Sequence, residues 1–186
     1  MSSTTSTATV PKTGTYTVDP AHTDVSFVAR HLVGTKVRGR FTDVEGSFTV
    51  ADRPEDSTLQ ATVQAESIFT GQVQRDEHLR TNDFLDVPNH PTLTLVSTGI
   101  RRAGENWVVT ADLTIRGVTK SVDFDLEFLG EGASMQEGKS VVAFSASATI
   151  DRRDFGVSFN HSLLDGSVVV GNKVVIEIEA EAALAE

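Results

Sequence analysis

The sequence predicts an all-β fold and favours a single closed antiparallel barrel of about eight strands, in up-and-down order with one short helix, over a sandwich. Apolar and polar residues alternate along most of the chain, as in strands with one buried and one exposed face. Many alternating segments span about 8–12 residues, and ten residues reach roughly 33 Å, which suits a tall barrel. Short links at 104–106 and 116–117 favour sequential antiparallel neighbours.

The first half of the chain contains four predicted strands. Alternation is weaker over residues 14–19, 23–30 and 41–51, and it is strict over residues 58–66, which read TLQATVQAE. In this last segment one face carries only apolar side chains, those of Leu59, Ala61, Val63 and Ala65. We expect that face to point into the barrel.

Residues 74–85, QRDEHLRTNDFL, are the one stretch that departs from this pattern. They are rich in helix formers, and Leu79 is placed to contact Phe84 or Leu85 on one side. Asp76 is expected to cap the first turn, where a carboxylate meets free N–H groups. Prolines follow at once and end the helix, so we predict one short helix inside an all-β chain.

The second half contains five predicted strands, over residues 92–100, 106–115, 121–128, 142–150 and 174–181. The clearest pattern is SVDFDLEF, in which every second side chain is apolar and the others are mostly acidic. Phe124 in this segment, and Phe144 and Ala146 in the next, are therefore expected to point inward.

Small residues at inward positions decide whether the barrel is hollow. Alanine occupies four of them, at 61, 65, 146 and 148. A lumen lined by Val, Leu, Phe and Ala would stay partly open and would bind apolar molecules. Alternatively, the ten phenylalanines fill the space that the alanines leave. Alternation alone does not separate these two interpretations.

Composition excludes several classes of protein. The 186 residues suit one domain, and the net charge of −10 argues against binding to nucleic acid or to anionic membranes. The absence of cysteine excludes disulfides, thiolate metal sites and cysteine nucleophiles. No apolar run approaches the roughly 20 residues that would span a bilayer, so membrane insertion is not expected.

The N-terminal residues, MSSTTSTATVPK, are rich in Ser and Thr and lack the basic start and apolar run of a secretory signal. We therefore expect a disordered tail over residues 1–12, a folded barrel over residues 13–184 and a cytoplasmic protein.

Five motifs together resemble the YceI-like family of lipocalin-like barrels. They are DPAHTDVSFVARHL (19–32), RGRFTDVEGSF (38–48), SIFTGQVQRDEHLRTNDFLDVPNHPTLTLVST (67–98), LTIRGVTKSV (113–122) and ATIDRRDFGV (148–157). The resemblance implies a single barrel whose lumen holds a long isoprenoid chain, such as a polyprenyl phosphate or a quinone tail. Many members of this family are secreted, and enzymatic activity is not its established property. The expected function is therefore non-catalytic binding, sequestration or transport, with no cofactor besides the bound lipid.

The ligand-binding residues expected on this basis are inward-facing apolar side chains and two polar residues of the helical segment. Arg75 and His78 form a polar collar for the lipid head group in one interpretation, and Arg75 clamps the segment over the barrel mouth in the other. Arg38 and Arg40 are further candidates for neutralising a phosphate. The full set expected to bind ligand comprises Phe27, Ala61, Val63, Arg75, His78, Leu79, Phe84, Phe124, Phe144, Ala146 and Phe155.

No catalytic or metal-binding residue is expected. The five histidines lack metal-ligand spacing, and no nucleophile elbow, P-loop or dinucleotide motif occurs. One alternative is an enzyme that uses the same cavity with His22, His31 or His78 as general base. Another is a stress-related interaction protein with a filled barrel and no ligand. The sequence leaves pairing into a homodimer open.

Overall fold

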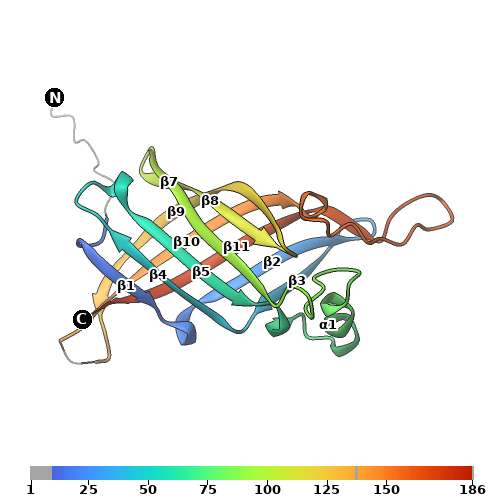
Figure 1. Ribbon diagram of the computed structural model, residues 1–186, viewed down its shortest axis with the longest axis horizontal. Helices are drawn as coiled ribbons and strands as arrows, with labels where there is room; N and C mark the ends of the chain where they lie inside the picture. Colours follow the sequence, from blue (N-terminus) through green and yellow to red (C-terminus); the bar gives the residue numbers. More distant parts are fainter. Residues whose placement is uncertain (1–9, 137, 186) are drawn as a thin grey trace.

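The computed structural model describes residues 10–136 and 138–185 and shows an elongated β-barrel with one helix at one end (Figure 1). The strands are β1 (Gly14–Val18), β2 (Asp24–His31), β3 (Thr35–Phe41), β4 (Val44–Val50), β5 (Thr58–Gln64), β6 (Ile68–Phe69), β7 (Thr92–Ala103), β8 (Asn106–Ile115), β9 (Val118–Ala133), β10 (Ser140–Asp151) and β11 (Val170–Leu184). Of the expected tail, the structure describes Val10, Pro11 and Lys12, and residues 1–9 lie outside the described residues.

The barrel is closed by antiparallel pairs throughout. The ring runs β1-β4-β5-β7-β8-β9-β10-β11, and β11 pairs with β1 to complete it. The closing pairs include Tyr16 with Leu184 and Val18 with Ala182. This confirms the predicted eight-strand antiparallel barrel with one helix and excludes the sandwich.

The N-terminal part of the barrel, from β1 to β4, forms one long bent hairpin with two arms. β1 and β2 lie along one arm, separated by the short turn η1 (Pro20–His22), and β3 and β4 lie along the other. The pair Thr17–Ser47 ends the β1–β4 ladder, and the β2–β3 ladder begins at the pair Val25–Phe41. Among the described pairs none joins the two arms between these points, so the barrel wall has a break beside η1.

β3 is a strand that the sequence did not predict. Lys36, Arg38 and Arg40 point outward, and the inward positions are Val37, Gly39 and Phe41, so the glycine interrupts the apolar face. A side chain at Gly39 is excluded because its Cβ would lie 2.3 Å from the Phe27 ring. The break in the hydrophobic pattern is thus a consequence of close packing between β2 and β3.

The short links occur where the sequence placed them. β7 and β8 are joined through Gly104, and β8 and β9 through Arg116 and Gly117. Both residues of the second link have positive φ, 50° and 72°, as a two-residue hairpin with the right-handed twist of its strands requires.

The helix α1 (Val73–Arg80) is shorter than the predicted range 74–85. It ends where Thr81 becomes extended, and the Thr81 hydroxyl donates to the His78 carbonyl at 2.7 Å. The remaining residues, 81–91, fold into turns that include Asp86 at a φ of 50°. Within the described residues, no helix has both the length and the apolar character needed to cross a bilayer.

The segment between β5 and β7 covers one end of the barrel. β6 pairs with β3, and the Ala65 amide donates to the Pro91 carbonyl at 2.9 Å. Arg80 of α1 donates to the backbone carbonyls of Glu66 and Ile68. These bonds tie α1 to the barrel wall and position it beside the lumen (Figure 1).

Candidate functional site

The lumen contains two cavities of about 190 and 260 Å³. Their walls are apolar wherever they face the empty space. Six residues belong to both walls, namely Val18, Ala61, Leu95, Phe124, Ile178 and Ala180. The two cavities are therefore neighbouring compartments of one lumen that share part of their walls.

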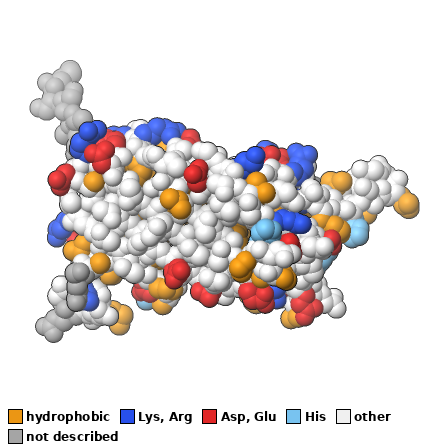
Figure 2. Space-filling model, in the orientation of Figure 1, with side chains coloured by type: hydrophobic (Ala, Val, Ile, Leu, Met, Phe, Trp, Pro, Cys, Tyr) orange, Lys and Arg blue, Asp and Glu red, His pale blue; other side chains and the backbone are white. Residues whose placement is uncertain are grey.

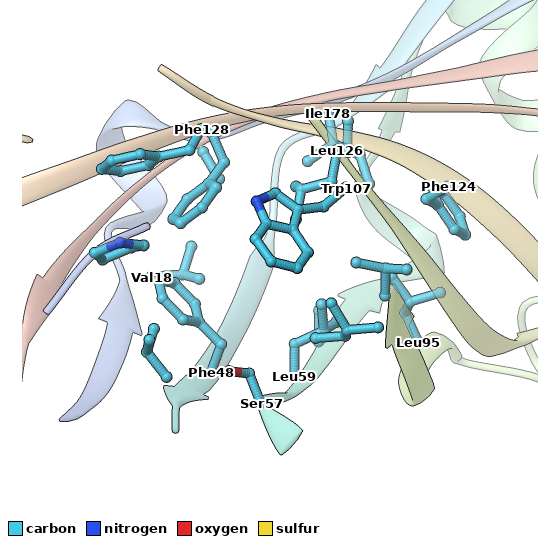
Figure 3. Close-up of a pocket in the computed structure, with 18 of the residues that line it drawn as sticks. Val18, Phe48, Ser57, Leu59, Leu95, Trp107, Phe124, Leu126, Phe128 and Ile178 are labelled. Carbon is cyan, nitrogen blue, oxygen red and sulfur yellow. The ribbon is translucent and has the colours of Figure 1, made fainter. Parts of the chain in front are cut away.

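The first cavity lies in the half of the barrel that contains the N-terminal segment. Its wall includes Val10, Pro11 and Pro54 at that end and side chains from strands on opposite sides of the barrel (Figure 3). Beside it, Tyr16 stacks on Phe48 with ring centroids 5.0 Å apart, and Phe48 contacts Phe144 edge to face. Phenylalanines thus fill part of this half and leave the rest open.

The second cavity lies in the half that contains α1. Its wall includes Leu79 and Phe84 from the α1 segment, Phe27 from β2, and Val157 and Val170 at the two ends of the long loop before β11. It also reaches the break in the wall, where Val18, Thr23, Gly46 and the exposed Glu45 line it. Strands, the α1 segment and the loop before β11 therefore all contribute to the wall of this compartment.

Nine of the eleven residues expected to bind ligand line this lumen. Ala61 and Phe124 belong to both compartments, and Phe144 and Ala146 belong to the first. The residues that line only the second are Phe27, Val63, Leu79, Phe84 and Phe155. Arg75 and His78 line neither. Ligand binding by any of these residues remains a prediction.

Arg75 is held by the turn that precedes α1. Its Nε donates to the Thr70 hydroxyl at 2.7 Å, and its Nη2 donates to the Thr70 carbonyl at 3.1 Å. The buried Asp76 accepts from the amide and the hydroxyl of the same threonine, at 2.9 and 2.6 Å. Asp76 therefore caps the preceding turn and not the first helical turn as expected, because Thr70 folds back over it.

His78 lies one side chain away from the lumen. Its ring contacts Phe84 and Phe159 edge to face, at centroid distances of 5.0 and 5.1 Å, and its Nε2 is 2.8 Å from Asp83. Phe84 lines the second cavity. The His78 ring thus packs against the outer side of Phe84, and its Nε2 faces Asp83.

Arg152 is a buried cation for which the sequence pattern predicted no role. Its guanidinium donates to the carbonyls of Val157, Phe159, Gly171 and, at 3.4 Å, Val170. Burial lowers the pKa of Arg152. These carbonyls lie at both ends of the loop before β11, so the side chain closes that loop onto the barrel. No local sequence signal could reveal this, because the acceptors are backbone atoms brought together by the fold.

Within residues 10–136 and 138–185, no three His, Asp or Glu side chains come together in a way that could hold a metal ion. His22 pairs with Asp19 at 2.8 Å, and His90 lies 3.9 Å from Asp86. None of the described residues that line the cavities is a histidine.

The family of this chain follows from its similarity to known proteins. The family model described as the YceI-like domain matches residues 16–182. The chain belongs to the YceI-like family. A UPF0312 protein from Staphylococcus epidermidis is 36% identical over 168 residues, which cover 89% of this chain and 95% of that protein. A UPF0312 protein from Staphylococcus aureus is 34% identical over 176 residues, covering 92% and 98%.

Solved structures of three other proteins share the barrel. BcnA from Burkholderia cenocepacia superposes with a TM-score of 0.76 at 22% identity, covering 88% of this chain and 98% of BcnA. The YceI protein of Campylobacter jejuni gives 0.70 at 27% identity, covering 84% and 90%. A polyisoprenoid binding domain from Saccharophagus degradans gives 0.67 at 15% identity, covering 91% and 98%.

Proposed function

We propose that this barrel binds one long-chain isoprenoid lipid in its lumen and sequesters or transports it without changing it chemically. The observation that carries this proposal is the pair of neighbouring apolar compartments inside the barrel, which share part of their walls. Membership of the YceI-like family and the shared fold with a polyisoprenoid binding domain support the choice of an isoprenoid among apolar chains.

The energy of binding would come from burying hydrocarbon. One CH₂ group is worth about 0.8 kcal/mol, so a five-carbon isoprene unit contributes on the order of 3–4 kcal/mol before ordering costs. The surface that the lumen presents to a lipid chain is almost entirely apolar. Selectivity would therefore depend on the length and shape of the two compartments.

The same wall argues against catalysis in the lumen. A general base must lie within hydrogen-bonding reach of the proton that it removes. Among the described residues that line either cavity, His22, His31 and His78 do not occur. The enzymatic alternative therefore lacks the contact that it requires, and we infer a non-catalytic binding protein.

The polar end of the lipid would lie outside the apolar lumen, and we place it at the α1 end. His78 is adjacent there, through Phe84, to the second cavity, and Arg75 lies on the same helix. Both the phosphate of a polyprenyl phosphate and the carbonyl oxygens of a quinone would accept hydrogen bonds from such groups.

Native mass spectrometry of the purified protein, followed by solvent extraction, tests the proposal. We expect a discrete added mass that extracts as a prenyl lipid, or stoichiometric uptake when the bare protein is incubated with a polyprenol or a quinone. A bare protein that takes up neither lipid would contradict the proposal and favour the filled-barrel interpretation.

A further inference from the structure

We propose that the end of the barrel formed by the β2–β3 turn and the loop before β11 docks on the surface of an anionic phospholipid bilayer. The docking itself does not require a bound lipid. Its consequence, exchange of lipid between the bilayer and the lumen, rests on the proposed function.

Two chain segments lie together at this end. The Leu32 amide donates to the Val169 carbonyl at 2.8 Å, and His31 pairs with Val170 at the start of β11. These contacts join the β2–β3 turn to the base of the loop 156–169, which extends from the barrel in Figure 1. The two segments therefore form one surface.

Large apolar side chains are exposed along this surface, which we call the apolar tips. They are Leu32 and Val33 in the turn and Leu163, Leu164 and Val168 in the loop. Val33 and Leu164 are fully exposed, and orange side chains mark the protruding loop in Figure 2. Exposed apolar clusters of this kind mark sites of protein or membrane contact.

The loop is ordered by hydrogen bonds and not by burial of these side chains. The Leu163 amide donates to the Ser167 carbonyl at 2.8 Å, and the Asn160 Oδ1 accepts from the amides of Val169 and Val170 at 3.0 Å. The backbone thus holds Leu164 fully exposed and leaves Leu163 partly exposed.

Basic residues lie directly behind the apolar tips. Arg30 stands opposite Lys36, and Arg38 and Arg40 follow on the same outer face of the β2–β3 hairpin. No acidic residue occurs between Val25 and Thr42. The described ion pairs include none of these four cations, so their charge is free to attract anionic lipid.

The charge of the β2–β3 hairpin is opposite to that of the whole chain. The loop before β11 adds one carboxylate, Asp165, and the exposed Asp154 lies nearby on η4 (Arg152–Phe155), beside the Arg153–Asp151 pair. Acidic residues lie on the neighbouring α1 segment, at Glu66, Glu77, Asp83 and Asp86, and farther along β11, at Glu177, Glu179 and Glu181. Because charges are screened beyond about 10 Å, the local sign governs contact with a bilayer.

The lumen begins behind this surface. Val157 and Val170, at the two ends of the loop, line the second cavity together with Phe27 and Ala29 of β2. Docking by the apolar tips would therefore bring this compartment close to the bilayer. The apolar side chains would insert into the interface while the hairpin cations contact the phosphates.

Cosedimentation of the full chain with vesicles tests the docking. We expect binding to vesicles of phosphatidylcholine mixed with phosphatidylglycerol, and binding at least about tenfold weaker to phosphatidylcholine alone or at high salt. The double variant Val33→Asp, Leu164→Asp should weaken partitioning by about tenfold or more. Charge reversal by Lys36→Glu and Arg38→Glu should weaken binding to the anionic vesicles only.

A matched control lies at the other end of the barrel. Met135, between β9 and β10, is as exposed as Val33 and Leu164, and Met135→Asp should leave vesicle binding unchanged. Equal binding by wild type and the double variant, or loss of binding in Met135→Asp, would overturn the proposal. So would an absence of binding to either vesicle, or an effect of the double variant on self-association alone.

Lipid uptake measured without vesicles separates this proposal from the proposed function. If the double variant still takes up polyprenol from detergent solution but does not bind vesicles, both proposals stand. If wild type takes up polyprenol but does not bind vesicles, docking is wrong and the proposed function remains. If vesicles are bound but polyprenol is not, the proposed function is the one that fails.

Discussion

Trp107 on β8 lies directly opposite Leu126 on β9, and both side chains line the first cavity (Figure 3). The indole is almost completely buried, and it is the only tryptophan in the chain. A lipid that enters this compartment must therefore contact the only strong fluorophore that the protein contains.

Trp107 fluorescence should report occupancy of the lumen. We expect a quinone with an isoprenoid tail to quench the emission in a saturable way, and a saturated polyprenol to shift it without quenching. Trp107→Phe should remove the signal while mass spectrometry still detects uptake. Quenching that rises linearly without saturation would indicate collision in solution and not binding in the lumen.

A large side chain at Ala146 should block the first compartment. Ala146 points into this cavity from β10, whereas Ala143 on the same strand points outward. We expect Ala146→Phe to reduce lipid uptake at least about tenfold, since overfilling a packed site costs about 1–3 kcal/mol. Uptake assays and thermal melts of both variants check this.

Ala143→Phe serves as the matched control and should bind lipid like the wild type. Both variants should unfold in one cooperative transition. Unchanged uptake by Ala146→Phe would mean that the lipid does not occupy this half of the lumen.

Arg152 should contribute strongly to stability. Replacement by Met would leave one buried and several partly buried carbonyls without this donor, and an unsatisfied buried group costs about 1–3 kcal/mol. We expect Arg152→Met to lower the free energy of unfolding by about 2–4 kcal/mol in urea titrations. Arg152→Lys should not restore it, because one ammonium cannot reach acceptors on both ends of the loop.

The exposed neighbour Arg153 provides the comparison. It pairs with Asp151 on the surface at 2.7 Å, so Arg153→Met should change stability little. Equal effects of the two substitutions would contradict the structural role of Arg152.

Arg75→Ala distinguishes a clamp from a head-group ligand. Because its guanidinium donates to Thr70, we expect the substitution to lower the free energy of unfolding by about 1–2 kcal/mol, with or without lipid. Gln74→Ala, at the exposed position before it, is the control. Unchanged stability together with weaker binding of a polyprenyl phosphate, but not of a polyprenol, would instead assign Arg75 to the head group.

Alternation along single strands was sufficient to predict several of the residues that line the lumen. Positions such as Ala61, Phe124 and Ala146 point inward because side chains alternate across a strand, and this relationship is local. The same logic missed β3. At Gly39 the space that a side chain would occupy is filled by the ring of Phe27, a residue on the neighbouring strand. The hydrophobic pattern of a strand cannot show that a neighbouring strand requires a glycine in it.

Properties that depend on distant segments could not be predicted. The acceptors of Arg152 and the meeting of Leu32 with Val169 both join residues far apart in the chain. The net charge of −10 likewise contains no information on where Lys36, Arg38 and Arg40 lie, because it is a sum over the whole chain.

The pair His22–Asp19 at the break in the barrel wall should make stability depend on pH. The hydrogen bond to Asp19, and the charges of Asp19 and Glu181, raise the pKa of His22 above its ordinary value of 6.5. The bond to His22 and the Ala21 amide lower the pKa of Asp19 below 3.8. The attraction requires a protonated histidine and an ionised aspartate.

The stabilisation from His22 is therefore complete below its ordinary pKa of 6.5 and disappears as pH rises through the raised pKa. It is also lost in acid, as pH falls through the lowered pKa of Asp19. Accordingly, the difference in melting temperature between wild type and His22→Gln should be larger at about pH 5.5 than at about pH 9. In NMR titrations, Asp19→Asn should lower the pKa of His22. A difference in melting temperature that does not vary with pH would show that the pair contributes nothing to the closure of the wall beside η1.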